Sequence, residues 1–347
     1  MKHNWTITSL LVLFFVLAQF TGLALLNKES EVAINPQTQE TVISYNSTAI
    51  GDRPETSGAG SLIYIIIAIA IGTILVLFIA RYGKTNIWRT WFFLAVWMAL
   101  CVSLGVMIKE NVYLPYDIAI ILALILTSWK LFRPNIYIHN LTEILMYSGI
   151  GLIIVPLFDV KWALALLILI SIYDMYAVWK SKHMITLAKF QSQSNMFAGL
   201  MIPYKTSGKN QKVEILSASE LRESSLKSHT SNKSSSESEK LVNTTPKIRA
   251  GKTAPQNAIL GGGDIVFPLV FIGTVMNDMI LRLAKLNPLM SIEAIKSAAF
   301  LESSIIVVTA TISLTLLFIF AKKGRFYPAM PFLSAGCLIG WAITLII

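Results

Sequence analysis

The chain has 347 residues, of which 54% are hydrophobic and only 14% are charged, against roughly 25% charged residues in an ordinary soluble domain. The apolar residues come in blocks of about 17 to 22, each long enough to cross a hydrocarbon core of roughly 30 Å as a helix. A water-soluble globule is therefore excluded, and a polytopic membrane protein is predicted. The net charge of +10 is typical of basic cytoplasmic loops rather than of nucleic-acid binding, so we expect no nucleic-acid partner.

The apolar blocks predict an all-α polytopic membrane protein with nine transmembrane helices. In chain order the predicted spans lie near 5–26, 61–80, 88–108, 116–132, 141–158, 161–179, 258–281, 300–320 and 328–347. The first block is longer than the apolar core of about 7 to 15 residues in a signal peptide, so we expect it to be a retained span.

The charges of the connections predict the orientation of the spans. Basic connections face the cytoplasm, and they lie at 81–89, 130–140 and 321–327. The acidic segment 27–60 is expected on the external side. With nine spans, the N-terminus is then cytoplasmic and the C-terminus external. Only the mildly basic segment 282–299 goes against this arrangement.

The predicted domains are a membrane part at 1–179 with the external loop 27–60, a cytoplasmic loop at 180–257, and a second membrane part at 258–347. The loop has 13 Lys and Arg, 5 Asp and Glu and 14 Ser residues. From about Ser207 onward it has too little apolar surface to fold, so we expect disorder. A solvated linker is the simplest interpretation, and binding to lipid headgroups or nucleic acid is the alternative. The more apolar start, Met184 to Met201, is expected to form a helix on the membrane surface.

Acidic residues inside the spans are informative, because a charged carboxylate at bilayer depth costs at least ~2.5 kcal/mol. Most have a simple explanation: Asp117, Glu143 and Glu302 are expected near headgroups, and Asp278 is expected to pair with Arg282 one turn later. Asp174 and Asp264 remain. Asp174 lies near the cytoplasmic end of the sixth span and Asp264 near the cytoplasmic start of the seventh, both roughly 7 to 9 Å deep at 1.5 Å per residue.

Two carboxyl groups that share a site hold a single proton near neutral pH. This is the general acid and base state that peptide hydrolysis needs. A proton or cation relay in a transporter is an equally good use of such a pair on spacing alone.

The residues around Asp264 favour hydrolysis. Three glycines at Gly261, Gly262 and Gly263 and a proline at Pro268 disfavour a regular helix. Because irregular backbone at membrane depth is tolerated only where it faces protein or water, we expect a wet cavity beside Asp264.

Three motifs together resemble the presenilin and signal peptide peptidase superfamily of intramembrane aspartyl proteases. They are Tyr173-Asp174, Gly261-Gly262-Gly263-Asp264 and Pro328-Ala329-Met330-Pro331. The resemblance includes the number and order of the spans and the long loop between the sixth and seventh. The orientation and the modest length are most similar to the archaeal presenilin-type homologues.

The resemblance implies roles for individual residues. Asp174 and Asp264 match the catalytic pair. The residues expected to shape the site or contact substrate are Tyr173, Gly261, Gly262, Gly263, Pro328, Ala329, Met330 and Pro331. Met330 departs from the family's Pro-Ala-Leu motif, and Gly262 stands where relatives usually have a larger residue, so altered efficiency or preference is expected.

The predicted function is that of an intramembrane aspartyl endopeptidase, and no cofactor is expected. No metal is expected either, because the four histidines are scattered along the chain. It would act in the lipid bilayer, most simply the plasma membrane, on single-span or signal-peptide-like substrates; homo-oligomerisation is left open. The alternatives are a proton- or cation-coupled transporter or channel, for which no inverted repeat is evident, a prepilin or preflagellin-type peptidase, and a catalytically silent relative.

Overall fold

The computed structural model describes nine stretches of the chain. They are residues 5–34, 41–53, 58–82, 85–109, 116–133, 135–181, 198–204, 256–321 and 327–346. The predicted disordered part of the long loop lies outside these residues.

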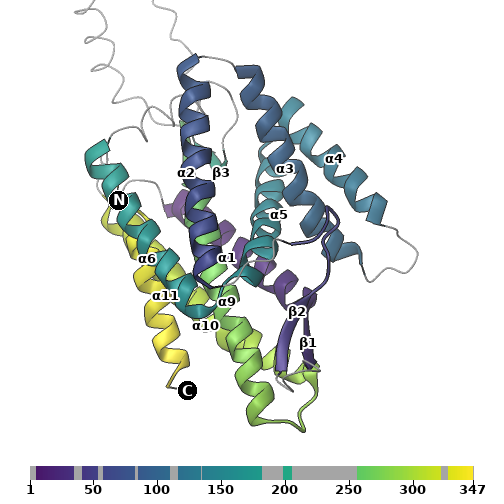
Figure 1. The fold of residues 1–347 in the computed structure, drawn as a ribbon. Helices are drawn as coiled ribbons and strands as arrows, with labels where there is room; N and C mark the ends of the chain where they lie inside the picture. The colour runs from purple at the N-terminus through teal and green to yellow at the C-terminus, as the bar shows by residue number, and fades with distance from the viewer. Residues whose placement is uncertain are drawn as a thin grey trace, which may run out of the picture. The chain divides into compact units, whose positions relative to one another are not determined.

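The described residues are mainly helical (Figure 1). The helices are α1 (Trp5–Glu29), α2 (Ala59–Tyr82), α3 (Thr85–Ile108), α4 (Tyr116–Phe132), α5 (Ile136–Ile154), α6 (Val160–Tyr176), α9 (Gly263–Leu286), α10 (Ile292–Phe320) and α11 (Met330–Thr344). The strands are β1 (Ser30–Ile34), β2 (Thr41–Tyr45), β3 (Gly199–Tyr204) and β4 (Gln256–Gly261).

Seven helices in the described part of the chain are long and apolar enough to cross a membrane, where the sequence predicted nine spans. The two that fall short are α4, with 17 residues, and α11, with 15. Both are apolar helices at their predicted places, so the order of the helices agrees with the prediction while their lengths differ.

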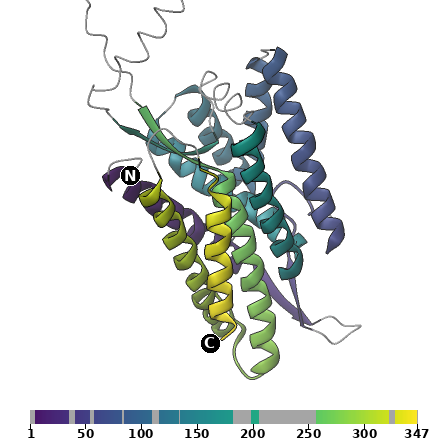
Figure 2. The same cartoon turned by 90° about the vertical axis from the view of Figure 1, so that its left-hand side faces the viewer.

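The helices pack into one unit made of residues 1–202 and 259–347. Within it, α1 contacts α3, α5, α9 and α10, and α6 contacts both α9 and α11 (Figures 1 and 2). The interior-facing helix α9 buries most of its side chains between Ile265 and Ile280. This packing brings α6, α9 and α11, which are far apart in sequence, to one place.

Two helices begin earlier than predicted because polar residues cap them. α5 begins at Ile136, where the side chain of Asn135 accepts the N–H of Tyr137, and α10 begins at Ile292, where Ser291 accepts the N–H of Ala294. Such caps satisfy free N–H groups of the first turn. The predicted connection 282–299 is therefore mostly helical.

The start of α9 also differs from the prediction, because the predicted span at 258–281 begins with a strand. β4 occupies Gln256–Gly261 and α9 begins only at Gly263. The chain changes from strand to helix within the glycine run, where the backbone is least restricted.

The all-α prediction is wrong in one respect, because two two-stranded sheets accompany the helices. β1 pairs with β2 in antiparallel register, Ser30 opposite Tyr45 and Ile34 opposite Thr41, within the predicted loop 27–60. β3 pairs with β4. Residues 199–201, predicted as part of a surface helix, therefore belong to a strand. This strand contains Gly199 and Pro203, which are poor helix formers.

Helices α10 and α11 approach each other closely through glycines. A Cβ added at Gly340 would lie 2.2 Å from Thr309 Oγ1 and 2.7 Å from Ile306 Cα, and one added at Gly336 would lie 2.8 Å from Ala310 Cα. Small residues spaced four apart allow such contact between membrane helices. The position of α11 is therefore fixed by α10.

Candidate active site

The structure brings Asp174 and Asp264 together. Asp174 lies two residues before the end of α6, and Asp264 is the second residue of α9. These two helices pack against each other, and the two carboxyl groups interact electrostatically. Both residues are intermediate in exposure, neither fully buried nor open to the surface.

The carboxyl group of Asp174 is held by the start of α11. The N–H of Met330 donates to Asp174 Oδ2 at 3.1 Å, and the N–H of Ala329 donates to the same carboxyl group. N–H groups at the beginning of a helix have no partner within the helix and favour a negative charge. Pro331, in the first turn, has no N–H to satisfy.

Two further features of the chain lie near Asp174, one before it and one after it in sequence. The hydroxyls of Ser171 and Ser334 are 2.6 Å apart and join α6 to α11 in the interior. Directly after α6, Ala177–Ser181 forms a π-helical turn, a rare irregularity that often occurs at functional sites.

The carboxyl group of Asp264 is held by its own turn. The N–H of Gly261 donates to it. Gly262, the N-cap residue directly before α9, accepts the N–H groups of Ile265 and Val266 at 3.1 and 3.0 Å. Pro268 lies inside α9. Because proline has no N–H, the carbonyl of Asp264, four residues earlier, lacks its usual helical partner.

The depth predicted for Asp264 was based on a helix that begins at residue 258, six residues before Asp264. In the structure Asp264 lies in the first turn of α9, immediately after β4. Its negative charge is therefore next to the positive end of the helix dipole, a stabilising arrangement that the sequence-based boundaries did not give.

The other predicted site residues differ in their surroundings. Pro328 and Met330 are buried, whereas Gly263 is exposed and the side chain of Tyr173 is 45% exposed. Tyr173 therefore lies at the surface of the helical unit rather than in the core.

Sequence reasoning missed the polar face of α5. Glu143, expected near headgroups, is fully buried in the third turn of α5, where it pairs with Lys130 of α4 and accepts the hydroxyl of Tyr147. A signal was present: Lys130 and Glu143 are opposite charges in consecutive apolar segments, and buried charges are normally paired.

The same face of α5 holds β3. The side chain of Asn140 donates to the carbonyl of Met201 and accepts its N–H, both at 2.9 Å, and His139 Nε2 is 2.9 Å from the carbonyl oxygen of Gly199. Asn140 thus pairs with Met201 as a neighbouring strand would.

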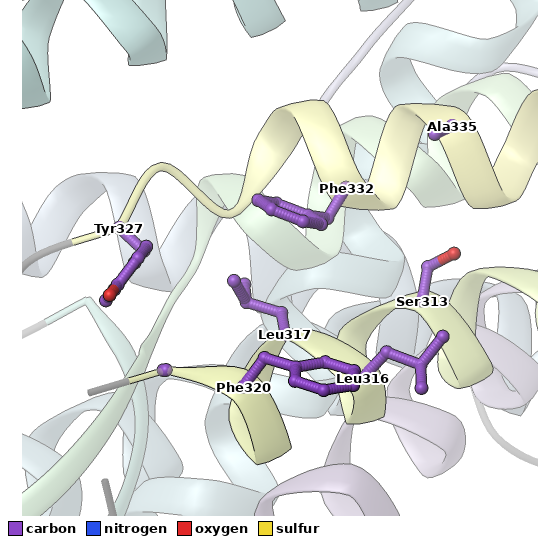
Figure 3. Close-up of a pocket in the computed structure, with 8 residues that line it drawn as sticks. Ser313, Leu316, Leu317, Phe320, Tyr327, Phe332 and Ala335 are labelled. Atoms are coloured by element: carbon purple, nitrogen blue, oxygen red, sulfur yellow. The ribbon is translucent and has the colours of Figure 1, made fainter. Parts of the chain in front are cut away.

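A cavity of about 300 Å³ lies between α10 and the start of α11 (Figure 3). Its lining is apolar apart from one serine hydroxyl and one phenol: Ser313, Leu316, Leu317, Phe320, Ala321, Tyr327, Phe332 and Ala335. Neither aspartate lines it, so it offers an apolar surface next to the Pro328–Pro331 segment and no acid or base.

Among the described residues, no group of three or more His, Cys, Asp and Glu side chains is placed to hold a metal ion. What the geometry provides is two interacting carboxyl groups, each with main-chain N–H donors, from two different helices. This arrangement is suited to general acid and base chemistry on a polar bond.

The sequence matches the family described as signal-peptide peptidase, presenilin aspartyl protease over residues 10–347. The chain belongs to this family. It is accordingly an integral, multi-pass membrane hydrolase of the intramembrane aspartyl protease type, and the transporter alternative is not favoured. No curated protein matches the chain.

Two solved structures of presenilin family intramembrane aspartate proteases share the fold. One, in space group P2, has 17% identity and a TM-score of 0.54 over 97% of this chain and 96% of that chain. The other, in space group C222, has 15% identity and a TM-score of 0.55 over 98% of both. The fold of this member of the family is therefore presenilin-like.

Proposed function

We propose that the protein hydrolyses peptide bonds within transmembrane helices of its substrates, with Asp174 and Asp264 as the acid and base. The observation that carries this proposal is the meeting of the two carboxyl groups at the ends of α6 and α9, with main-chain N–H groups donating to both.

In the proposed mechanism, one carboxylate takes a proton from a water molecule, whose oxygen then attacks the scissile carbonyl carbon. The other carboxyl group, protonated at this stage, donates its proton to the carbonyl oxygen. The roles then reverse: the first group gives its proton to the leaving nitrogen, the C–N bond breaks, and the carbonyl re-forms as its hydroxyl proton returns to the second group. The donors at Met330, Ala329 and Gly261 would hold both groups in place.

The substrate would be a single-span or signal-peptide-like membrane helix that unwinds near the site. Unwinding exposes backbone groups that need partners in the bilayer. The end of β4 at Gly261 and the irregular Pro328–Ala329 segment are placed beside the aspartates, and pairing of the unwound backbone with them would offset the broken helical hydrogen bonds.

The proposed topology keeps the N-terminus in the cytoplasm and the C-terminus outside, in the plasma membrane. Its support is the concentration of Lys and Arg in the connections predicted to be cytoplasmic. The segment 180–257 would link the membrane parts 1–179 and 258–347, each of which supplies one aspartate.

The first test replaces Asp174 or Asp264 by alanine in protein reconstituted into liposomes with a single-span substrate, and identifies the products by mass spectrometry. We expect each variant to lose cleavage, because either remaining carboxyl group lacks its partner. A matched control is Asp278→Asn, since Asp278 lies on α9 but pairs with Arg282 at 2.6 Å; this variant should remain active.

Residual cleavage by either aspartate variant would refute the two-aspartate mechanism. Binding of a transition-state-mimicking aspartyl protease inhibitor by the wild-type protein, without cleavage of any membrane-anchored peptide, would instead identify a catalytically silent relative.

A further inference from the structure

A second buried polar cluster lies beside the aspartate pair and consists of Lys130, Glu143 and Tyr147. Their exposed fractions are 6%, 0% and 1%. Lys130 Nζ pairs with Glu143 Oε1, and the Tyr147 hydroxyl donates to Glu143 Oε2. Both oxygens of the Glu143 carboxylate are therefore used, and the hydroxyl of Tyr147 has a fixed direction.

Tyr147 contacts the turn that precedes Asp264. A Cβ added at Gly262 would lie 2.8 Å from both Tyr147 Cε1 and the Tyr147 hydroxyl oxygen. There is thus no room for any side chain at this position unless Tyr147 moves. Tyr147 also interacts electrostatically with Asp264.

Gly262 is the residue on which the geometry of Asp264 depends. Its carbonyl accepts the first N–H groups of α9, and its N–H donates to the carbonyl of Ala198 at 3.3 Å. The residue before it, Gly261, supplies the N–H that holds the Asp264 carboxyl group. A displacement of the Gly262 peptide would therefore move both the donor and the carboxyl group.

The cluster is part of one continuous face of α5. Asn140, Glu143 and Tyr147 are spaced three and four residues apart, which places them on the same side of a helix. Asn140 holds β3 through Met201, and Tyr147 touches Gly262, the residue directly after β4. One face of α5 therefore contacts both β3 and the turn that follows β4.

A buried ion pair gives little net stability, because the cost of removing both charges from water offsets their attraction. Stability alone does not explain Lys130 and Glu143. Their geometry does have a specific effect: the carboxylate directs the Tyr147 hydroxyl, and Lys130 balances its charge.

We propose that Tyr147 is a positioning residue for peptide-bond hydrolysis. Glu143, neutralised by Lys130, orients the Tyr147 side chain against Gly262, and this contact fixes the turn that carries Gly261 and Asp264. The proposal rests on the proposed function and assigns Tyr147 no contact with substrate.

The test compares Tyr147→Phe with Ser148→Ala in reconstituted protein. Ser148 is an ideal control because it is also buried and its hydroxyl donates to Ile144 of the same helix at 2.9 Å. We expect Tyr147→Phe to lower kcat about tenfold with KM unchanged, because one directed hydrogen bond next to the acid-base pair is lost. Ser148→Ala should keep the wild-type kcat.

A second variant applies if Tyr147→Phe fails to fold. Gly262→Ala keeps Tyr147 and its hydrogen bond to Glu143, but its Cβ would lie 2.8 Å from the Tyr147 ring and so displaces the turn. We expect Gly262→Ala to lower kcat with KM unchanged. An unchanged kcat in either variant, a change in KM alone, or an equal loss in Ser148→Ala would overturn the proposal.

These measurements distinguish the two-aspartate mechanism from the positioning role of Tyr147. A wild-type protein that cleaves no substrate refutes the proposed function and, with it, the role of Tyr147. If the wild-type protein is active and Tyr147→Phe has the same kcat, the positioning role is refuted and the two-aspartate mechanism is unaffected.

Discussion

At the scale of single residues, the site depends on where main-chain N–H groups point. Asp174 receives them from Ala329 and Met330, and Asp264 receives one from Gly261. A carboxyl group held in this way can accept or release a proton without losing its position, which is what two alternating acid and base steps require.

Met330 departs from the family's Pro-Ala-Leu motif, and its environment predicts that this difference has a mild effect on cleavage. Its contribution to Asp174 is the backbone N–H, which leucine also has. Its side chain is buried, and a methionine-to-leucine exchange keeps the volume. We expect Met330→Leu to cleave a single-span peptide within about threefold of the wild-type rate, with some change in the cleaved positions.

Measuring the products of Met330→Leu by mass spectrometry separates rate from position. Complete loss of activity would contradict the assignment, because it would mean that the methionine side chain, and not the N–H, supports Asp174.

At the scale of elements, the β1–β2 hairpin is attached to the helices at a distance from the aspartates. The Tyr45 hydroxyl donates to Asn277 of α9 at 2.8 Å, and the guanidinium of Arg53 lies 5.3 Å from the centre of the Tyr45 ring and donates to Leu152. The hairpin is therefore attached to the middle of α9 through Tyr45, and Arg53, which lies over the Tyr45 ring, binds the end of α5.

Burial raises the pKa of Tyr45 above its ordinary value of 10.0. Above that pH the unfolded chain releases the phenol proton while the folded chain keeps it, so the stabilising contribution is complete below pH 10.0 and is lost as the pH rises further. We expect the melting temperature in detergent to fall between about pH 9 and pH 11, and to fall less in Tyr45→Phe.

The comparison with Tyr45→Phe isolates this group from the lysines and other tyrosines that titrate in the same range. Parallel pH curves for the two proteins would show that the Tyr45 hydroxyl is not buried against Asn277.

At the scale of the whole molecule, the sequence predicted the order of the helices and the two aspartate motifs, because both depend on local patterns. It misplaced the starts of α5 and α10, since their capped first turns contain polar residues that a hydropathy average excludes. It also missed the Lys130–Glu143 pair, although the two opposite charges in consecutive helices were a usable signal. The pairing of β3 with β4 could not be predicted in this way, because it joins segments that are distant in sequence.

The long segment between the aspartates gives a prediction at this scale. Residues 207–252 are rich in serine and charged residues. Replacing them by a short Gly/Ser linker should leave cleavage of a single-span peptide unchanged, because the entropy cost of closing a flexible loop depends only weakly on its length. A loss of activity in a folded protein, checked by circular dichroism, would assign this segment a part in catalysis or substrate entry.

The close contact of Gly336 and Gly340 with α10 has a consequence for how the site can open. A helix seated backbone to backbone cannot slide or rotate without severe overlap, so α11 and α10 must travel as one rigid body. Separating α6 from α11 would therefore move α10 and α11 together and break the Ser171–Ser334 hydrogen bond. We expect any opening of the site on this side to depend on that hydrogen bond.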